Sequence, residues 1–222
     1  LAALTPEAFA RLAHLRTDEH AHRDSSFDRE GQNRDYALSS NFLYVDDKGD
    51  QVYVDQRGPG CLYRIWMTQP FNGGIGFGDH QTIQMYFDDE PVPRVSMKLS
   101  ELFSGSHPPF VAPLVGDESI SSGGFFSLVP MPFAKALRIT VSNPDDFFYY
   151  QFDTHRFDPS VSVSTWTGSE DVSAARAFLS AAGSDPKPPA PRTSATGTLT
   201  VPAGSSALLL DTSGPGEIAS IR

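Results

Sequence analysis

A polar segment near the N-terminus carries residue types suited to holding a sugar. In the stretch SSFDREGQNRDY at 25–36, Asp28 and Asp35 offer carboxylates, Arg29 offers a guanidinium and Asn33 offers an amide. Carboxylates accept hydrogen bonds from hydroxyl groups, amides donate and accept them, and arginine offers a planar fork of donors. The set can therefore contact a polyol. The alternative is a solvated loop whose Asp and Asn side chains cap turns.

Aromatic residues offer a second kind of sugar contact. Trp66 and the run FFYY at 147–150 can stack on sugar rings, and Gln151 and Asp153 follow in the string YYQFD. In a β-sandwich, most such aromatic residues instead belong to the core.

Other kinds of catalytic or metal site have little support. The single cysteine, Cys61, excludes an intramolecular disulfide and a cysteine-based zinc site. The six histidines give neither HExxH spacing nor a cupin-type set, so we expect no metal and no cofactor. The acidic run at 46–50 is better explained by a hairpin turn than by a calcium loop. No G-x-S-x-G string is present, and no helix follows the glycines at 73–78.

The charge balance excludes some partners. The chain has 17 basic and 27 acidic residues, a formal net charge of −10. This balance disfavours nucleic acid and anionic membrane surfaces, and it suits a neutral or cationic ligand better. No apolar run approaches the roughly 20 residues that span a bilayer. The compartment stays open, with a secreted or cell-envelope location slightly favoured.

The elements that position these residues are predicted to be mostly β. The 18 glycines and 18 prolines supply turns, and 16 phenylalanines supply apolar bulk. Short apolar runs alternate with turn signals from 36 to 158, which indicates an all-β jelly-roll sandwich with short helical additions. In the run 61–69, Leu62, Arg64 and Trp66 alternate with Tyr63, Ile65 and Met67. Further strands are expected within 82–92, 94–103, 125–133, 136–143 and 147–157, with a hairpin turning at 47–50.

Helical signals flank this region. The residues at 5–15 predict a short helix that Thr5 caps, and those at 169–183 predict a second helix that Ser169 caps and Gly183 ends. Residues 17–35 lack a sustained apolar period, so we expect a long loop there. Residues 184–197 form a Pro-rich linker.

An internal repeat indicates two tandem β domains. VYVDQRGPGCLYRI at 52–65 aligns without a gap with LLLDTSGPGEIASI at 208–221, and both copies contain Gly-Pro-Gly. The alternative is a chance match of two turns. The predicted organisation is an N-terminal helix and polar loop (1–35), a first jelly roll (36–168), a helix and linker (169–197) and the first strands of a second, incomplete jelly roll (198–222). A strand pair alone is marginal in water, so we expect 198–222 to pair with a continuation of the same gene product.

Several motifs in register resemble glycoside hydrolase family 172, also known as DUF2961. They are SSFDREGQNRDY, VDQRGPGCLYRIWMT, MYFDDEPVPRVSMKLSELF, GGFFSLVPMPFAKALRITVSN and YYQFD, over about residues 10–155. The resemblance implies two tandem jelly rolls, assembly as homotrimers or multiples of trimers, and a retaining, exo-acting α-furanosidase. The substrates it implies carry α-D-arabinofuranosyl or α-D-fructofuranosyl linkages, and we lean towards the former.

The resemblance also implies that this half is catalytically incomplete. The family's two catalytic glutamates belong to the second jelly roll, near a GTxTEDYF-like string that is absent here. The string TGSED at 167–171 matches only superficially, so Glu170 receives no role, and the catalytic pair is expected downstream of Arg222. This half would contribute substrate contacts, for which we select Asp28, Arg29, Asn33, Asp35, Trp66, Gln151 and Asp153. The competing hypothesis is a jelly-roll module that binds glycan or builds an oligomer without chemistry.

Overall fold

The chain is described from a computed structural model. It describes residues 5–11, 14–34, 41–69, 78–142, 149–184 and 193–218, and the structural statements below concern these residues. Among them, no helix is long and apolar enough to cross a membrane.

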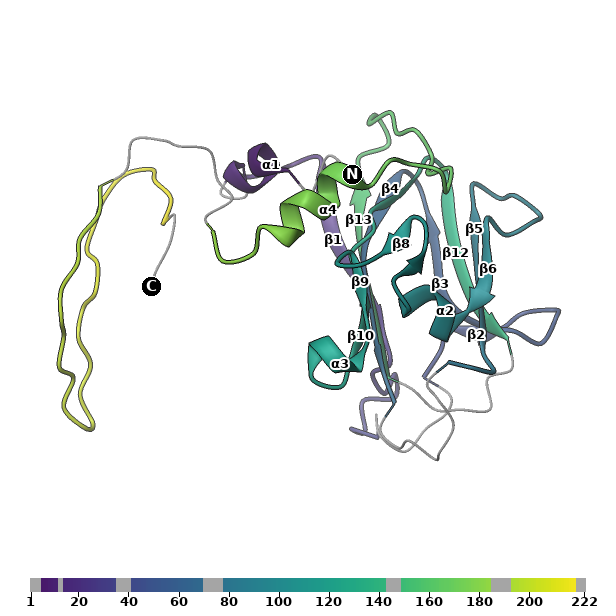
Figure 1. Ribbon diagram of the computed structural model, residues 1–222, viewed down its shortest axis with the longest axis horizontal. Helices are drawn as coiled ribbons and strands as arrows, with labels where there is room; N and C mark the ends of the chain where they lie inside the picture. Colours follow the sequence, from purple (N-terminus) through teal and green to yellow (C-terminus); the bar gives the residue numbers. More distant parts are fainter. Residues whose placement is uncertain are drawn as a thin grey trace.

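Two antiparallel sheets pack face to face, which confirms the predicted all-β sandwich (Figure 1). Sheet A has the order β1 (Glu19–Ser25), β13 (Tyr149–Phe157), β4 (Gly60–Thr68), β10 (Phe125–Ser127), β9 (Val115–Gly116), and β11 (Met131–Phe133) also pairs with β4. Sheet B has the order β2 (Tyr44–Val45), β3 (Gln51–Arg57), β12 (Ala136–Ser142), β5 (Thr82–Phe87), β6 (Val95–Lys98). A small hairpin joins β7 (Ser106–His107) to β8 (Phe110–Val111). The helices are α1 (Pro6–Ala10), α2 (Leu99–Phe103), α3 (Glu118–Ser121) and α4 (Ser173–Ser180).

The core lies between the two sheets because alternate residues of each strand point inward. Ile65 and Phe152 from sheet A and Met85 and Ile139 from sheet B are fully buried. Alternation of this kind is the strand period, so one face of each sheet is apolar. Burying each such side chain contributes about 1.5–3 kcal/mol, which makes this layer the main source of stability.

The predicted Gly-Pro-Gly turn carries the chain from one sheet to the other. It joins the end of β3 in sheet B to the start of β4 in sheet A. Gly58 has a φ of +94°, a conformation that side chains rarely adopt. A Cβ on Gly60 would lie 2.6 Å from the His155 carbonyl oxygen, so the strand crossing there requires a glycine.

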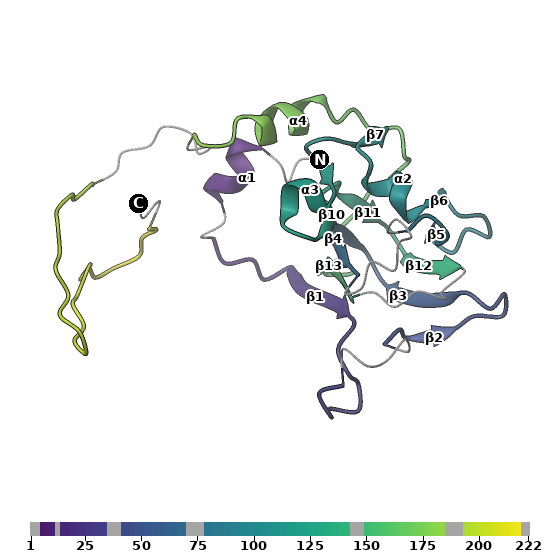
Figure 2. The same cartoon turned by 60° about the horizontal axis from the view of Figure 1, so that its bottom comes forward.

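The expected loop at 17–35 is partly wrong, because it contains β1. Residues Glu19–Ser25 pair along their whole length with β13, from Glu19 opposite Phe157 to Ser25 opposite Gln151. The strand therefore forms through a partner far away in sequence, and its own residues show no apolar period. Figure 2 shows β1 and β2 on the same side of the sandwich, where each ends its sheet.

Three other expected elements also change. The helix expected at 5–15 is described only as Pro6–Ala10. The strand expected at 94–103 ends at Lys98, and the chain continues as α2. The carboxylate of Glu101, in the first turn of α2, accepts the backbone N–H of Lys98. The second helix begins at Ser173 and not after Ser169, because the Asp171 carboxylate accepts the N–H of Ser173.

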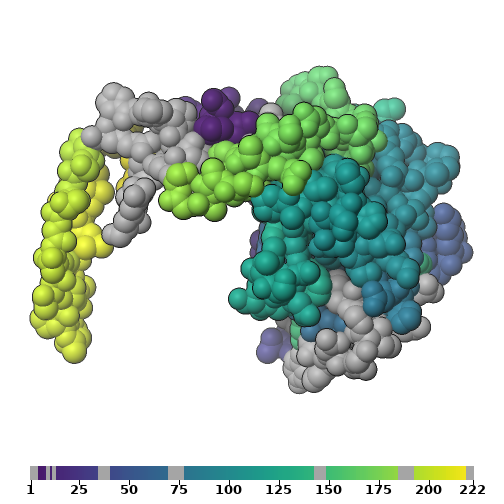
Figure 3. All heavy atoms as spheres, viewed as in Figure 1, coloured from purple at the N-terminus to yellow at the C-terminus, as the bar shows by residue number. Residues whose placement is uncertain are grey.

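Residues 193–218 contain no helix or strand and lie apart from the sandwich (Figures 1 and 3). We call this segment the C-terminal arm. Its apolar side chains are exposed, with Leu208 at 75%, Leu209 at 78% and Leu210 at 55%. The strands expected at 198–222 are thus not formed in the described part of this segment.

Candidate functional site

The outer face of sheet A gathers three of the selected residues. Along β13, Tyr150, Phe152 and Thr154 are buried, whereas Gln151 and Asp153 are partly exposed on the opposite face. In the register of β13 with β4, Gln151 lies opposite Trp66 and Asp153 lies opposite Arg64. Trp66, Gln151 and Asp153 therefore share one face, as their spacing allows.

Arg64 lies on the same face, two residues before Trp66, and the pairing becomes irregular just before Arg64 in β4. The register passes from Asp153 opposite Arg64 to Thr154 opposite Leu62, so Tyr63 is an extra residue in β4. Leu62 and Ile65 both point into the core, and Tyr63 and Arg64 both lie outside. Strict alternation would have put Leu62 on the same face as Arg64 and Trp66, so that expectation is wrong at Leu62. Bulges of this type re-aim side chains and are frequent beside functional sites.

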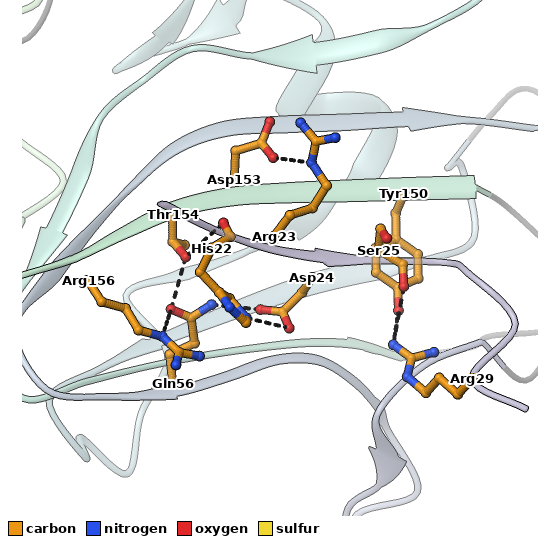
Figure 4. Close-up of polar contacts among 10 residues, drawn as sticks. All are labelled: His22, Arg23, Asp24, Ser25, Arg29, Gln56, Tyr150, Asp153, Thr154 and Arg156. Carbon is orange, nitrogen blue, oxygen red and sulfur yellow. Dashed lines mark hydrogen bonds and ion pairs between the residues drawn. The ribbon is translucent and has the colours of Figure 1, made fainter. Parts of the chain in front are cut away.

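Four side chains form a continuous hydrogen-bonded row across β1, β13 and β4. Arg23 Nε donates to Asp153 Oδ1 at 2.5 Å, and Arg64 Nη1 donates to Asp153 Oδ2 and to Gln151 Oε1, both at 2.9 Å. We call Arg23, Asp153, Arg64 and Gln151 the polar row. Figure 4 shows Arg23 and Asp153 on the side of the strands opposite to Asp24 and Gln56.

Asp153 is held in its charged form within the polar row. Partial burial raises its pKa, but the hydrogen bonds and positive charges of Arg23 and Arg64 outweigh burial, so the pKa is lowered from its ordinary value. Both carboxylate oxygens already accept a guanidinium N–H. The Asp153 carboxylate therefore binds its two arginines in preference to a ligand.

Trp66 lies half-buried at one end of the polar row. Its cross-strand neighbours are Gln151 on β13 and Phe126 on β10. A Cβ on Gly124 would lie 2.5 Å from the indole Nε1, so the segment after α3 passes close to the edge of the ring. The ring is thus fixed in place beside polar donors, an arrangement that suits stacking on a sugar.

The selected loop residue Asp28 is bound by the backbone of its own loop. The Asp28 carboxylate is buried and accepts backbone N–H groups of Glu30 at 3.0 Å, Gln32 at 3.1 Å and Arg34 at 3.0 Å. Burial raises its pKa, but the hydrogen bonds from Arg34 and Glu30 outweigh burial, and the pKa is lowered. Asp28 therefore shapes the loop at 28–34 from within.

Two other selected loop residues, Arg29 and Asn33, are described. Arg29 donates to the Ser25 carbonyl and to the Tyr150 hydroxyl, both at 3.2 Å, which ties the loop to β13 (Figure 4). Asn33 is exposed, with a left-handed φ of +56°. Asp35 lies outside the described residues.

A second polar cluster sits on the inner side of β1 and joins the two sheets. The Gln56 amide donates to Asp24 Oδ2 at 2.7 Å, and the Thr154 hydroxyl donates to Gln56 Oε1 at 3.0 Å. His22 Nε2 lies 3.3 Å from Asp24 Oδ1. Gln56 and Thr154 are buried, so this cluster closes the edge of the core.

The remaining reactive groups are engaged locally. Burial raises the pKa of the Cys61 thiol to about 12, which leaves it protonated at neutral pH. Glu170 accepts the backbone N–H groups of Thr167 and Gly168, so it stabilises a turn before α4. Among the described residues, no group of three or more His, Cys, Asp or Glu is placed to hold a metal ion.

Comparison with known proteins identifies the family of the chain. A family model described as the first β-sandwich domain of glycoside hydrolase family 172 matches residues 17–174. The chain belongs to glycoside hydrolase family 172. The match confirms the resemblance seen in the motifs, and no match was found among curated proteins. The family 172 domain begins before β1 and ends within α4, so β1 lies inside the matched range.

Sequence reasoning missed two members of the polar row. Arg64 and Arg23 were not selected, although each donates to the selected Asp153. Arg64 stands two residues before Trp66 in the same string, and this spacing was the available signal. Arg23 offered none, because β1 itself was not predicted.

Proposed function

We propose that this protein is a retaining α-furanosidase that hydrolyses α-D-arabinofuranosyl linkages, with α-D-fructofuranosyl linkages as the alternative. Its membership of family 172 supports glycoside hydrolysis. The observation that supports a sugar contact on this domain is the half-buried Trp66 next to the polar row on the outer face of sheet A. Aromatic faces and fixed donors are the groups with which proteins hold sugar rings and hydroxyls.

The catalytic pair is proposed to lie outside residues 1–222. A retaining glycosidase needs two carboxyl groups about 5–5.5 Å apart, one of which is a free nucleophile. Asp28 accepts three backbone N–H groups, and Asp153 is held between two arginines. Neither suits attack on a sugar, so in this proposal the domain supplies contacts and the glutamates come from a second sandwich.

The internal repeat supports a second sandwich. Gly58 and Gly214, which occupy the same place in the two copies, have nearly the same φ, +94° and +95°. Val52 and Val54 of the first copy are fully buried, whereas their counterparts Leu208 and Leu210 are exposed. We propose that the C-terminal arm forms the corresponding strands when the rest of the second sandwich is present. Assembly as a homotrimer is part of the same proposal, and light scattering measures it.

The test is an assay of the complete gene product on two substrates. We expect release of arabinose from 4-nitrophenyl α-D-arabinofuranoside or of fructose from an α-D-fructofuranosyl disaccharide, with the first-formed anomer retained in NMR spectra. Residues 1–222 alone should release neither sugar. Inversion of the anomer, or activity on neither substrate, would contradict the proposal.

A second candidate is a glycan-binding module without catalysis. It is favoured by the engagement of Asp28 and Asp153 described above, because a binding site needs no free nucleophile. Binding of an oligosaccharide by the complete gene product without any hydrolysis supports this candidate.

A further inference from the structure

The polar row carries more positive than negative charge. Two guanidinium groups share the single carboxylate of Asp153. Arg64 donates to both Gln151 and Asp153 through a single nitrogen, Nη1, and Arg23 donates to Asp153 only through Nε. Among the described residues, the other N–H groups of these two side chains have no hydrogen-bond partner. The row is therefore a set of donors with a local charge of about +1, in a chain whose formal charge is −10.

Each acceptor oxygen of the polar row already accepts an N–H group from an arginine of the row. Both oxygens of Asp153 and the Gln151 carbonyl oxygen already accept N–H groups. A neutral sugar presents hydroxyls that must both donate and accept, and this row offers it few acceptors. A carboxylate presents only acceptors, and arginine binds it through paired N–H···O bonds. The overall negative charge predicted a neutral or cationic ligand, whereas the local chemistry favours an anion.

We propose that the outer face of sheet A binds a uronic acid residue of a glycan. Its carboxylate is held by Arg64 and Arg23, and its ring lies against Trp66, which is the cross-strand neighbour of Gln151. Asp153 does not touch the ligand in this site; its carboxylate competes with that of the ligand for both guanidinium groups. The β4 bulge at Tyr63 lies directly beside Arg64, and bulges are frequent next to functional sites.

This inference goes beyond the proposed furanoside hydrolysis and does not depend on it. A glycan can carry a uronic acid at a distance from the bond that is cleaved. The two proposals can therefore fail separately, because hydrolysis can occur without uronate binding and uronate binding can occur without hydrolysis.

The test compares tri-galacturonate with its methyl ester, in which each carboxylate is replaced by an uncharged methyl ester group. Calorimetry with the full chain is expected to show binding of the acid, weakening as salt rises, and at least about tenfold weaker binding of the ester. Arg64→Met should weaken binding of the acid by about tenfold or more. The matched control is Arg57→Met, because Arg57 is an exposed arginine on β3 paired only with Asp89.

A second variant separates an ionic site from a structural row. Asp153→Asn removes the internal competitor and keeps the shape, so binding of the acid should stay equal or tighten. Circular dichroism establishes that each variant is folded. Equal affinity for acid and ester, no binding of either, unchanged affinity in Arg64→Met, or weakened binding of the acid in Asp153→Asn would each overturn the proposal.

Discussion

At the scale of single residues, carboxylates in this domain mostly accept N–H groups of the protein itself. Asp28 gathers the backbone of its own loop, and Asp88 accepts the N–H groups of Lys135 at 2.6 Å and Ala136 at 3.1 Å. Their pKa values are lowered, since these hydrogen bonds outweigh the effect of burial. Acidic residue types suited to sugars therefore serve backbone geometry at these positions.

Asp28→Asn should lower stability at neutral pH, because an amide places donors where the carboxylate accepts three N–H groups. The folded pKa of Asp28 lies below the unfolded value of about 3.9, so its stabilising contribution is present above that value and is lost as pH falls through the folded pKa. Urea unfolding should thus show a gap between wild type and variant at pH 7 that narrows at pH 3. Glu30→Gln, on the exposed side of the same loop, is the control, and a gap independent of pH contradicts the prediction.

At the scale of elements, the crossing from β3 to β4 depends on the absence of a side chain. Gly60→Ala should cost about 1–3 kcal/mol of unfolding free energy, because its Cβ would meet the His155 carbonyl and the Phe133 ring, both at 2.6 Å. Gly197→Ala, with nothing within 4 Å, is the matched control and should be nearly neutral. Chemical denaturation measures both, and equal effects would refute this account.

The cluster that closes the edge of the core should behave as one unit. Gln56→Leu removes one hydrogen-bond partner of the buried Thr154 hydroxyl and one of Asp24, which should cost about 1–3 kcal/mol. Thr154→Val removes the other end of the same hydrogen bond. A double-mutant cycle should give a coupling of at least about 0.5 kcal/mol between the two positions. Simple additivity would show that the contact contributes nothing specific.

The strands that the sequence predicted are those with a local signature. β13 alternates buried and partly exposed residues along most of its length, and β12 is a short, mostly buried apolar run, so both were readable. β1 reads EHAHRDS and has no apolar side, because it is an edge strand held by pairing with a distant segment. No local pattern encodes such pairing, which is why a loop was expected there.

The candidate site was predictable to the same limited extent. Alternation puts Gln151 and Asp153 on one face, and the structure adds that Trp66 lies opposite Gln151. The spacing of Arg64 to Trp66 was readable, but its hydrogen bonds to Gln151 and Asp153 depend on the register of β4 with β13, which no local pattern encodes. The roles selected for Asp28, Arg29, Asn33 and Asp35 as sugar contacts remain predictions.

At the scale of the whole molecule, the C-terminal arm differs from the sandwich in every respect that matters to a protease. It has no regular structure, and Leu208, Leu209 and Leu210 are exposed. Thermolysin should therefore cut residues 1–222 near these leucines well before it cuts the sandwich, as mass spectrometry of the fragments will show. Protection of the same bonds in the complete gene product would support the second sandwich. Equal resistance of arm and sandwich in residues 1–222 would contradict the exposed arm.

The pairing of β1 with β13 also determines when β1 can pair during synthesis of the chain. Arg23 and its partner Asp153 are 130 residues apart, so β1 leaves the ribosome long before its partner strand exists. At about 5–20 residues per second, that wait is roughly 6–26 s. During this time the strand is kept from mispairing by its own composition, since its charged and histidine side chains disfavour contact with other strand edges. The charged and histidine residues that give β1 no apolar period thus also protect the strand from mispairing until β13 has been synthesised.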